Sequence, residues 1–299
     1  MNKCLVKWSG SKRIQASRIV DLFPNEIDTY YEPFMGGASV LIELLLRSDK
    51  TVNNYIASDL NAHVINLFNL IKSNPNKLIR SYEENWNYIN SKQDGKSDRY
   101  LEIRDRFNEN FSPEDFYFLT KTCYTGLIRF NKKGQFNVGY HFGRNGEKPD
   151  SASESIYFYS DLLNRKNVTF KCQSYNEIKP CGDDFVYFDP PYDNTKQTMY
   201  LGGFEKDKFF DFCRSLNCKY AISYDGGVVG DSASASIPND IFKESIAVDA
   251  MRNMRQTFKS DRYKTEVTRK TLQRFEMLYL NYTIVDISRI NNSITKKLF

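Results

Sequence analysis

The sequence predicts an α/β fold in which a mostly parallel sheet is interrupted by an inserted helical segment. Short runs rich in β-branched and aromatic residues, typical of buried parallel strands, alternate with helical patterns along much of the chain. Between residues 76 and 123 the pattern is helical, which predicts an insertion between two parts of the sheet. A chain of 299 residues is long enough for one sheet domain and a modest inserted one.

The first element is an aromatic strand that ends in a turn of small residues. It runs from Tyr30 through Gly36-Gly37-Ala38 into a helical pattern that begins near Val40. Small residues at such a turn let a ligand approach the backbone and expose N–H groups of a helix N-terminus. An ordinary tight turn of the same composition is the alternative.

The second strand, residues 55–59, ends in an acid. Asp59 follows the glycine turn by about 20 residues, the spacing at which a carboxylate holds the hydroxyls of a ribose. Asp59-Leu60-Asn61 is alternatively no more than a helix N-cap, since helical periodicity resumes after Asn61.

The inserted segment combines helices with an aromatic, basic hairpin. Helices are expected over 76–90, 99–108 and 112–123, and residues 124–140 then alternate around an Asn-Lys-Lys-Gly turn, which predicts a β-hairpin. Basic residues interleaved with aromatic ones on a hairpin suit entry into a nucleic-acid groove and wedging of a base step. A structural β-arm with solvated lysines is the alternative.

The chain then returns to the sheet. The expected helices are 153–163 and 204–212, and the expected strands are 168–172, 184–188, 220–224 and 275–282. The polar tail from Asn291 is expected to fray.

The strand 184–188 runs into Asp189-Pro190-Pro191-Tyr192. Two prolines remove two backbone donors and fix φ, so they form a rigid lip at the strand's carboxyl end. On that lip the Asp189 carboxylate and the Pro190 carbonyl are placed to accept the two N–H bonds of a purine amino group and to stabilise positive charge as it attacks a methyl group. Tyr192 is placed to stack on the base. The alternative is a simple turn with a surface acid and a core tyrosine.

Composition disfavours several other chemistries. The six cysteines form no C-x-x-C pair, and His63 and His141 are distant from each other, so a disulfide scaffold, a zinc site and a Ser-His-Asp triad have little support. Pro180-Cys181 precedes the strand instead of following it and is therefore interpreted as a turn. No apolar run approaches about 20 residues, so we expect a cytoplasmic protein.

The chain carries a net charge of +5, and residues 252–274 hold eight basic residues against two acids. Lys259 and Arg262 in this segment are expected to contact phosphates, with a solvated basic loop as the alternative.

Four motifs occur in one order: Lys7–Lys12, Glu32–Gly37, Ser58–Asn61 and Asp189–Tyr192. Together they resemble the Dam-type (D12 class, alpha group) DNA adenine-N6 methyltransferases over nearly the whole chain. The resemblance implies a Rossmann-like methyltransferase sheet with an inserted helical DNA-recognition domain. It departs where Ser11 and Ala38 replace family glycines.

The resemblance also implies the site. S-adenosylmethionine is expected to contact Trp8, Lys12, Glu32, Phe34, Gly36, Asp59, Tyr175 and Asp189, and catalysis is expected of Asp189, Pro190, Pro191 and Tyr192. The target adenine would be flipped out of the duplex. No metal is expected, because the sulfonium leaving group is already activated.

The hairpin resembles the family's target-recognition element. The residues expected to contact DNA are Tyr124, Leu127, Arg129, Asn131, Lys132, Lys133 and Asn137, together with Lys259 and Arg262. Thr125 replaces a family Asn and Gly139 a family Pro at positions that read bases in GATC-specific members, so the resemblance favours adenine methylation without specifying GATC.

We therefore divide the chain into a first catalytic part (1–74), a target-recognition domain (75–150), a second catalytic part (151–290) and a polar tail (291–299). The expected partners are double-stranded DNA and a cognate restriction endonuclease, and the expected state is a monomer in a bacterial or phage-infected cell. An RNA adenine methyltransferase and a catalytically silent DNA-binding regulator stay open as alternatives.

Overall fold

The computed structural model describes residues 5–126, 128–142, 145–191, 204–228, 237–249, 274–284 and 294–297. Four of the residues expected at the site, Leu127, Tyr192, Lys259 and Arg262, lie outside these ranges, as does nearly all of the basic segment that begins at residue 252.

The described strands form one sheet. They are β1 (Glu26–Glu32), β2 (Thr51–Asp59), β3 (Thr169–Cys172), β4 (Phe185–Phe188), β5 (Lys219–Val228), β6 (Glu244–Asp249), β7 (Arg274–Leu280) and β8 (Ile294–Lys297), in the order β3-β2-β1-β4-β5-β7-β6-β8. The first five in this order are parallel, whereas β7 is antiparallel to both β5 and β6. The order 3-2-1-4-5 is that of a doubly wound sheet and confirms the predicted Rossmann-like α/β fold.

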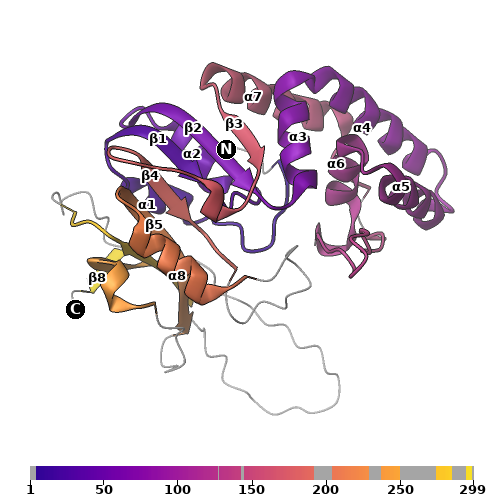
Figure 1. Cartoon of the computed structure of the whole chain (residues 1–299). Coiled ribbons are helices and arrows are strands. Elements are labelled where there is room, and N and C mark those ends of the chain that lie inside the picture. The colour runs from indigo at the N-terminus through magenta and orange to yellow at the C-terminus, as the bar shows by residue number, and fades with distance from the viewer. Residues whose placement is uncertain are drawn as a thin grey trace, which may run out of the picture.

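Helices cover the sheet and extend beyond it. The helices are α1 (Ala16–Asp21), α2 (Ser39–Leu46), α3 (Ala62–Ser73), α4 (Pro75–Asn90), α5 (Lys96–Asn110), α6 (Pro113–Thr122), α7 (Pro149–Arg165) and α8 (Lys206–Ser215). In Figure 1, α4, α5 and α6 gather to one side of the sheet, next to α3 and α7. Helix α3 packs on β2 and β3 and also on α4 and α6, so it joins the two layers.

The central strand β4 is buried on both faces. Phe185 and Tyr187 belong to the larger hydrophobic core, whereas Val186 and Phe188 belong to a second core on the opposite face. This division follows from the alternation of side chains along a strand. A strand buried on both sides is rigid, and it ends immediately before Asp189.

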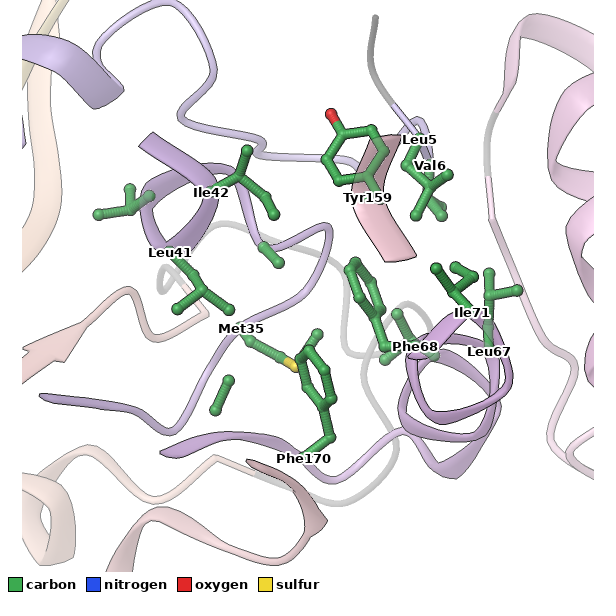
Figure 2. Packing of buried hydrophobic residues seen from close by; sticks show 14 of the residues in the cluster. Leu5, Val6, Met35, Leu41, Ile42, Leu67, Phe68, Ile71, Tyr159 and Phe170 are labelled. Carbon is green, nitrogen blue, oxygen red and sulfur yellow. The ribbon is translucent and has the colours of Figure 1, made fainter. Parts of the chain in front are cut away.

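The larger core continues from the sheet into the helical layer. Figure 2 shows Phe68 of α3 beside Tyr159 of α7, with Phe170 of β3 near Met35. The rings of Phe68 and Phe170 lie 5.1 Å apart between centroids. Because one continuous core spans both layers, the helical layer is packed firmly against the sheet.

Residues 124–140 fold back on themselves with less regular structure than the predicted hairpin. The described part holds isolated antiparallel bridges, Cys123↔Tyr140 and Phe130↔Phe136, and a 3-10 turn at Tyr124–Gly126, but no continuous strand. The backbone of Phe136 is bound by the side chain of Asn108 in α5, which donates to its carbonyl at 3.1 Å and accepts from its N–H at 2.7 Å. Helix α5 therefore supplies hydrogen bonds that a strand partner would have supplied.

Helix α1 and strand β6 were not predicted, and the expectation of a frayed tail was wrong for residues 294–297. Helix α1 is only six residues long and β6 is a short segment near the edge of the sheet, so both carry weak periodicity. Residues 294–297 pair with β6 as β8, so this part of the tail is not frayed.

Candidate active site

The carboxyl ends of β1, β2 and β4 meet at the topological switch point of the sheet. Strand β1 lies between β2 and β4, with Glu32 level with Ala57 and Tyr31 level with Val186. A cavity of about 320 Å³ opens there, as expected for an open α/β sheet. Its lining includes every residue expected to contact the cofactor, namely Trp8, Lys12, Glu32, Phe34, Gly36, Asp59, Tyr175 and Asp189, and also Pro190 and Pro191.

The turn between β1 and α2 is held against the end of β2. The Met35 N–H donates to the Ser58 carbonyl at 3.0 Å, and the Gly36 N–H donates to the Asp59 carboxylate at 2.9 Å. Gly36 has φ +45°, and a Cβ added to it would lie 2.6 Å from the Trp8 indole nitrogen. Only glycine therefore fits between the turn and the Trp8 ring.

Asp59 lines the cavity while organising the backbone around it. Its second oxygen accepts the Asn61 N–H at 2.9 Å, and the Asn61 side chain in turn accepts the His63 N–H at the start of α3. Burial raises the pKa of Asp59, and the backbone N–H groups of Asn61, Gly36 and Leu60 partly oppose that shift. The N-cap of α3 is thus Asn61. Asp59 holds in place the turns at Gly36 and Asn61, both of which line the cavity.

Glu32 is a buried acid at the end of β1. It is 3% exposed and accepts the Tyr30 hydroxyl at 2.7 Å. Burial raises the pKa of Glu32 to about 8, with the hydrogen bond from Tyr30 opposing the shift and the negative charge of Asp189 adding to it. Glu32 is therefore mostly protonated at neutral pH.

Asp189 is paired with Lys12 from the N-terminal segment. The Lys12 Nζ lies 2.6 Å from Asp189 Oδ1 and 3.4 Å from Glu276 Oε1 on β7. Burial disfavours the charged lysine, but the two carboxylates outweigh that cost and raise the pKa of Lys12. Glu276 was not predicted; its only signal was an acid within an otherwise aromatic and aliphatic strand.

Aromatic rings form one wall of the cavity. Phe34 stacks on Tyr175 with 5.5 Å between ring centroids, and Phe204 meets both rings edge-on. Phe204, Glu205 and Lys208, next to or within α8, line the cavity and were not predicted as site residues. A wall of this kind suits a flat heteroaromatic group.

The N-terminal segment is tied to α2 as well as to the sheet. The hydroxyl of Ser11 lies 2.6 Å from that of Ser39, the first residue of α2. Ser11 stands where the resemblance has glycine, so its side chain adds a hydrogen bond at the rim of the cavity.

The described part of residues 124–142, called here the bridged segment, presents polar and aromatic side chains. Tyr124 is 58% exposed and stacks on His141 at 5.4 Å, and Arg129 is exposed, with its Nε donating to Asn137 at 3.0 Å. The Asn131 side chain accepts backbone N–H groups within the 131–135 turn and is half-buried there. This turn holds Lys132 and Lys133 in solvent.

The bridged segment also lies against Lys7, which precedes the cavity residues Trp8–Lys12 in the chain. Gly126 has φ +70°, and a Cβ added there would lie 2.7 Å from the Lys7 side chain. Thr125 has φ +57°, a conformation that Asn adopts more readily than a β-branched residue. Asn is the residue that the resemblance expects at this position.

The doubly wound sheet, the cavity at its switch point and the Asp-Pro-Pro lip are the features of an α/β methyltransferase. Residues 8–254 match the family described as D12 class N6 adenine-specific DNA methyltransferase, and the chain belongs to that family. It is an adenine-specific DNA methyltransferase.

Relatives of the chain carry consistent names. It is 33% identical over 224 residues to the Type II methyltransferase M.MjaIII of Methanocaldococcus jannaschii, a match that covers 70% of this chain and 75% of the relative. It is 29% identical over 214 residues to the DNA adenine methylase of Serratia marcescens, covering 70% and 73%. Among solved structures, the rRNA methyltransferase aviRa of Streptomyces viridochromogenes aligns with 93% of this chain and 89% of its own, at a TM-score of 0.36 and 14% identity.

Within the described ranges, none of the helices combines the length and apolar character needed to span a bilayer. Among the described cysteines, Cys172, Cys181, Cys213 and Cys218 carry free thiols, and Cys181 lies in the turn before β4.

Proposed function

We propose that the chain transfers a methyl group from S-adenosylmethionine to N6 of a flipped-out adenine in double-stranded DNA. The observation that carries the proposal is that Asp189 and Pro190 line the same cavity as Glu32, the Gly36 turn and Asp59. The chain's family membership makes adenine in DNA the substrate, and the lip supplies acceptors for an amino group.

The cavity fits the proposed cofactor in three respects. The partly exposed Asp59 carboxylate would hold a ribose diol, the glycine turn would let the ligand reach the backbone, and the stacked Phe34 and Tyr175 rings would pack against a flat base. S-adenosylmethionine, when bound, supplies a methyl group activated on a sulfonium. Trp8, Lys12, Glu32, Phe34, Gly36, Asp59, Tyr175 and Asp189 would hold it.

In the proposed reaction, Asp189 and the Pro190 carbonyl accept the hydrogens of the adenine amino group. The amino nitrogen gains positive charge as it forms its bond to carbon, and the carboxylate stabilises that charge. Lys12 fixes one oxygen of Asp189, and the two prolines fix the carbonyl, so both acceptors are positioned before the base arrives. Pro191 and Tyr192 complete the lip, with Tyr192 stacking on the base.

The recognition segment would read the duplex and offset the cost of base flipping. We place Tyr124, Leu127, Arg129, Asn131, Lys132, Lys133 and Asn137 at the DNA, with Lys259 and Arg262 on phosphates. Flipping the base costs a few kcal/mol, which stacking of the base and insertion of residues 124–140 would offset. The proposed division of labour is 75–150 for recognition and 1–74 with 151–290 for catalysis.

Type II names among the relatives support a cognate restriction endonuclease as a partner. We propose a monomer that acts on DNA in the cytoplasm of a bacterial or phage-infected cell. Mapping modified adenines in the DNA of cells that express the chain tests the activity and the recognition sequence together. The absence of an enriched adenine motif would contradict the proposal.

Replacing Asp59 by alanine is expected to weaken cofactor affinity by at least about tenfold, because the acid would hold the ribose hydroxyls and also aligns the Gly36 and Asn61 turns. Calorimetric titration with S-adenosylmethionine measures the effect. DNA affinity without cofactor is the control and is expected to be unchanged. Unaltered cofactor affinity would leave Asp59 with only its backbone role.

Replacing Arg129 by alanine is expected to abolish most of the preference for the cognate sequence, since an arginine that pairs with a guanine edge contributes about 1–3 kcal/mol of discrimination. The controls are Lys132→Ala in the neighbouring 131–135 turn, Lys259→Ala and Arg262→Ala; they are expected to weaken all duplexes alike and to flatten the salt dependence. Binding to cognate and scrambled duplexes at several salt concentrations separates the two effects. If Arg129→Ala weakens binding to both duplexes equally, the segment contacts only phosphates and the sequence is read elsewhere.

Cofactor affinity is expected to rise with pH up to about 8. The pKa of Glu32 is about 8 in the free protein, and the positive charge of a bound sulfonium would lower it, so binding releases a proton between that lowered pKa and about pH 8, and none above. Titrations at several pH values measure the slope. Glu32→Gln cannot release that proton and is expected to flatten the profile; a profile of unchanged slope in this variant would show that another group titrates.

A further inference from the structure

Ser11 forms a hydrogen bond between the cavity residues Trp8–Lys12 and helix α2. Its hydroxyl oxygen lies 2.6 Å from that of Ser39, the first residue of α2, and both residues line the cavity. The two serines are 28 positions apart in the chain. Ser11 replaces a family glycine, and a glycine at this position could not make the bond.

Ala38, immediately before Ser39, replaces the second family glycine and has a strained backbone. Its φ is +56° and its ψ is +32°, the left-handed conformation that glycine adopts freely and that a Cβ disfavours. The Ala38 side chain is fully buried. A residue persists in such a conformation only where its surroundings hold it there.

The left-handed conformation of Ala38 connects the glycine turn to α2. The Ala38 N–H donates to the Met35 carbonyl at 2.6 Å, across the turn that contains Gly36, and the Ala38 carbonyl accepts the Ile42 N–H at 3.0 Å in the first turn of α2. A change of φ to the negative range would redirect the chain between these two bonds. Gly36, whose N–H holds Asp59, would then shift relative to α2.

The turn has other anchors, and they lie on either side of Ser39. Trp8 packs on Gly37, where an added Cβ would lie 3.0 Å from the Trp8 Cβ. Glu32 accepts the Leu41 N–H within the first turn of α2. The bond to Ser39 lies between these anchors and acts on the residue directly after the left-handed position.

The strain at Ala38 and the hydrogen bond of Ser11 are comparable in size. A left-handed backbone disfavours alanine relative to glycine by an amount similar to the net contribution of one hydrogen bond. Loss of the Ser11 hydroxyl is therefore sufficient to populate competing conformations of Ala38. With a glycine in place of Ala38, the same loss would have little effect.

We propose that Ser11 is a positioning residue for cofactor binding: its hydroxyl holds Ser39, so that Ala38 keeps the left-handed conformation on which the Gly36 turn depends. The proposal rests on the proposed binding of S-adenosylmethionine at that turn. The two departures from family glycines, Ser11 and Ala38, thus compensate for each other. A turn that is already formed strengthens binding, because the ligand does not have to order it.

Calorimetric titration of the full chain with S-adenosylmethionine tests the proposal in a double-mutant cycle. Ser11→Ala is expected to raise the Kd about fivefold, the effect of one hydrogen bond lost from a preformed site. In the Ala38→Gly background, the same substitution is expected to raise the Kd less than about twofold, because glycine keeps the left-handed conformation without help. In single-turnover methylation, Ser11→Ala is expected to raise the KM for S-adenosylmethionine and to change the rate at saturating cofactor less than about twofold.

Two substitutions outside the cavity lining are matched controls. Ser91→Ala removes a hydroxyl that donates to the Tyr88 carbonyl at 2.8 Å, at the end of α4, and is expected to leave the Kd unchanged. Asn167→Gly relieves another left-handed residue, with φ +50°, after α7. In its background the effect of Ser11→Ala is expected to stay about fivefold. If Asn167→Gly also removed the effect, a general gain in stability would explain it and the proposal would fail.

An unchanged Kd in Ser11→Ala would overturn the proposal, as would an effect of the same size in the Ala38→Gly background. If Ser11→Ala does not fold, Ser39→Ala removes the other end of the same bond and is compared in the two backgrounds by the same criteria. If the unaltered chain does not bind S-adenosylmethionine, the proposed function itself fails. If it binds and only the cycle is additive, the failure is confined to the role of Ser11.

Discussion

Replacing Asp189 by alanine is expected to lower methyl transfer by at least about a hundredfold, the effect of removing one preorganised group that stabilises developing charge. The fold is expected to survive, because Lys12 would still have Glu276 at 3.4 Å and would not become an unpaired buried cation. Single-turnover kinetics on an adenine-containing duplex measures the loss. The rate of Asp189→Asn, which keeps a hydrogen-bond acceptor but not the charge, is expected to lie between the rates of Asp189→Ala and the unaltered protein.

Asp184 provides the control for this prediction, since it lies immediately before the same strand that Asp189 follows. It accepts backbone N–H groups from Thr29 at 3.0 Å and Cys181 at 2.9 Å. Asp184→Ala is expected to cost about 1–3 kcal/mol of stability by leaving those donors unsatisfied, with little change in rate per folded molecule. A wild-type rate in Asp189→Ala would remove the central claim about the lip.

Replacing Gly36 by alanine is expected to weaken cofactor binding strongly, by roughly a hundredfold or more, and to destabilise the protein by about 1–2 kcal/mol from the backbone conformation alone. The new Cβ would lie 2.6 Å from the Trp8 indole nitrogen, so either the indole or the turn must move. Both line the cavity, and the Gly36 N–H also holds Asp59. Calorimetric titration and thermal unfolding measure the two effects.

Gly182→Ala isolates the conformational part of this effect. Gly182 has φ +55°, close to that of Gly36, but a Cβ added there would meet no atom within 4 Å. Its substitution is therefore expected to reduce stability by a similar amount and to leave cofactor affinity unchanged. Equal affinities of the Gly36 and Gly182 variants would mean that the Trp8 contact does not shape the cavity.

The parts of the site that lie at strand ends could be predicted from a few neighbouring residues in the chain. The glycine turn after β1, the acid that ends β2 and the two prolines after β4 each have a backbone requirement that a few neighbouring residues reveal. The parallel strands and the helices of the insertion were likewise predicted, because their periodicity is strong over their length. The eight residues expected at the cofactor do line one cavity, although their individual roles stay predictions.

Residues 124–140 show where local reasoning falls short. Aromatic alternation over 124–140 indicated paired strands. Phe130 and Phe136 form only an isolated bridge, and their rings pack on the helical layer: Phe136 contacts Phe107 of α5, and Phe130 contacts Phe116 of α6. The Asn108 side chain completes the backbone bonding. The alternation of aromatic residues correctly predicted that Phe130 and Phe136 are buried. It could not predict that the backbone of Phe136 is hydrogen-bonded by Asn108, which precedes it by 28 residues.

The sequence by itself determined the family, the order of the motifs and the residues that end each central strand, because these depend on neighbours along the chain. Only the tertiary structure decided that Lys12 meets Asp189 across 177 residues and that Glu276 lies 3.4 Å from Lys12. That contact depends on β7 entering the sheet antiparallel between β5 and β6, a pairing between distant segments that local periodicity does not encode. The two ion pairs of Lys12 are for this reason a property of the assembled sheet.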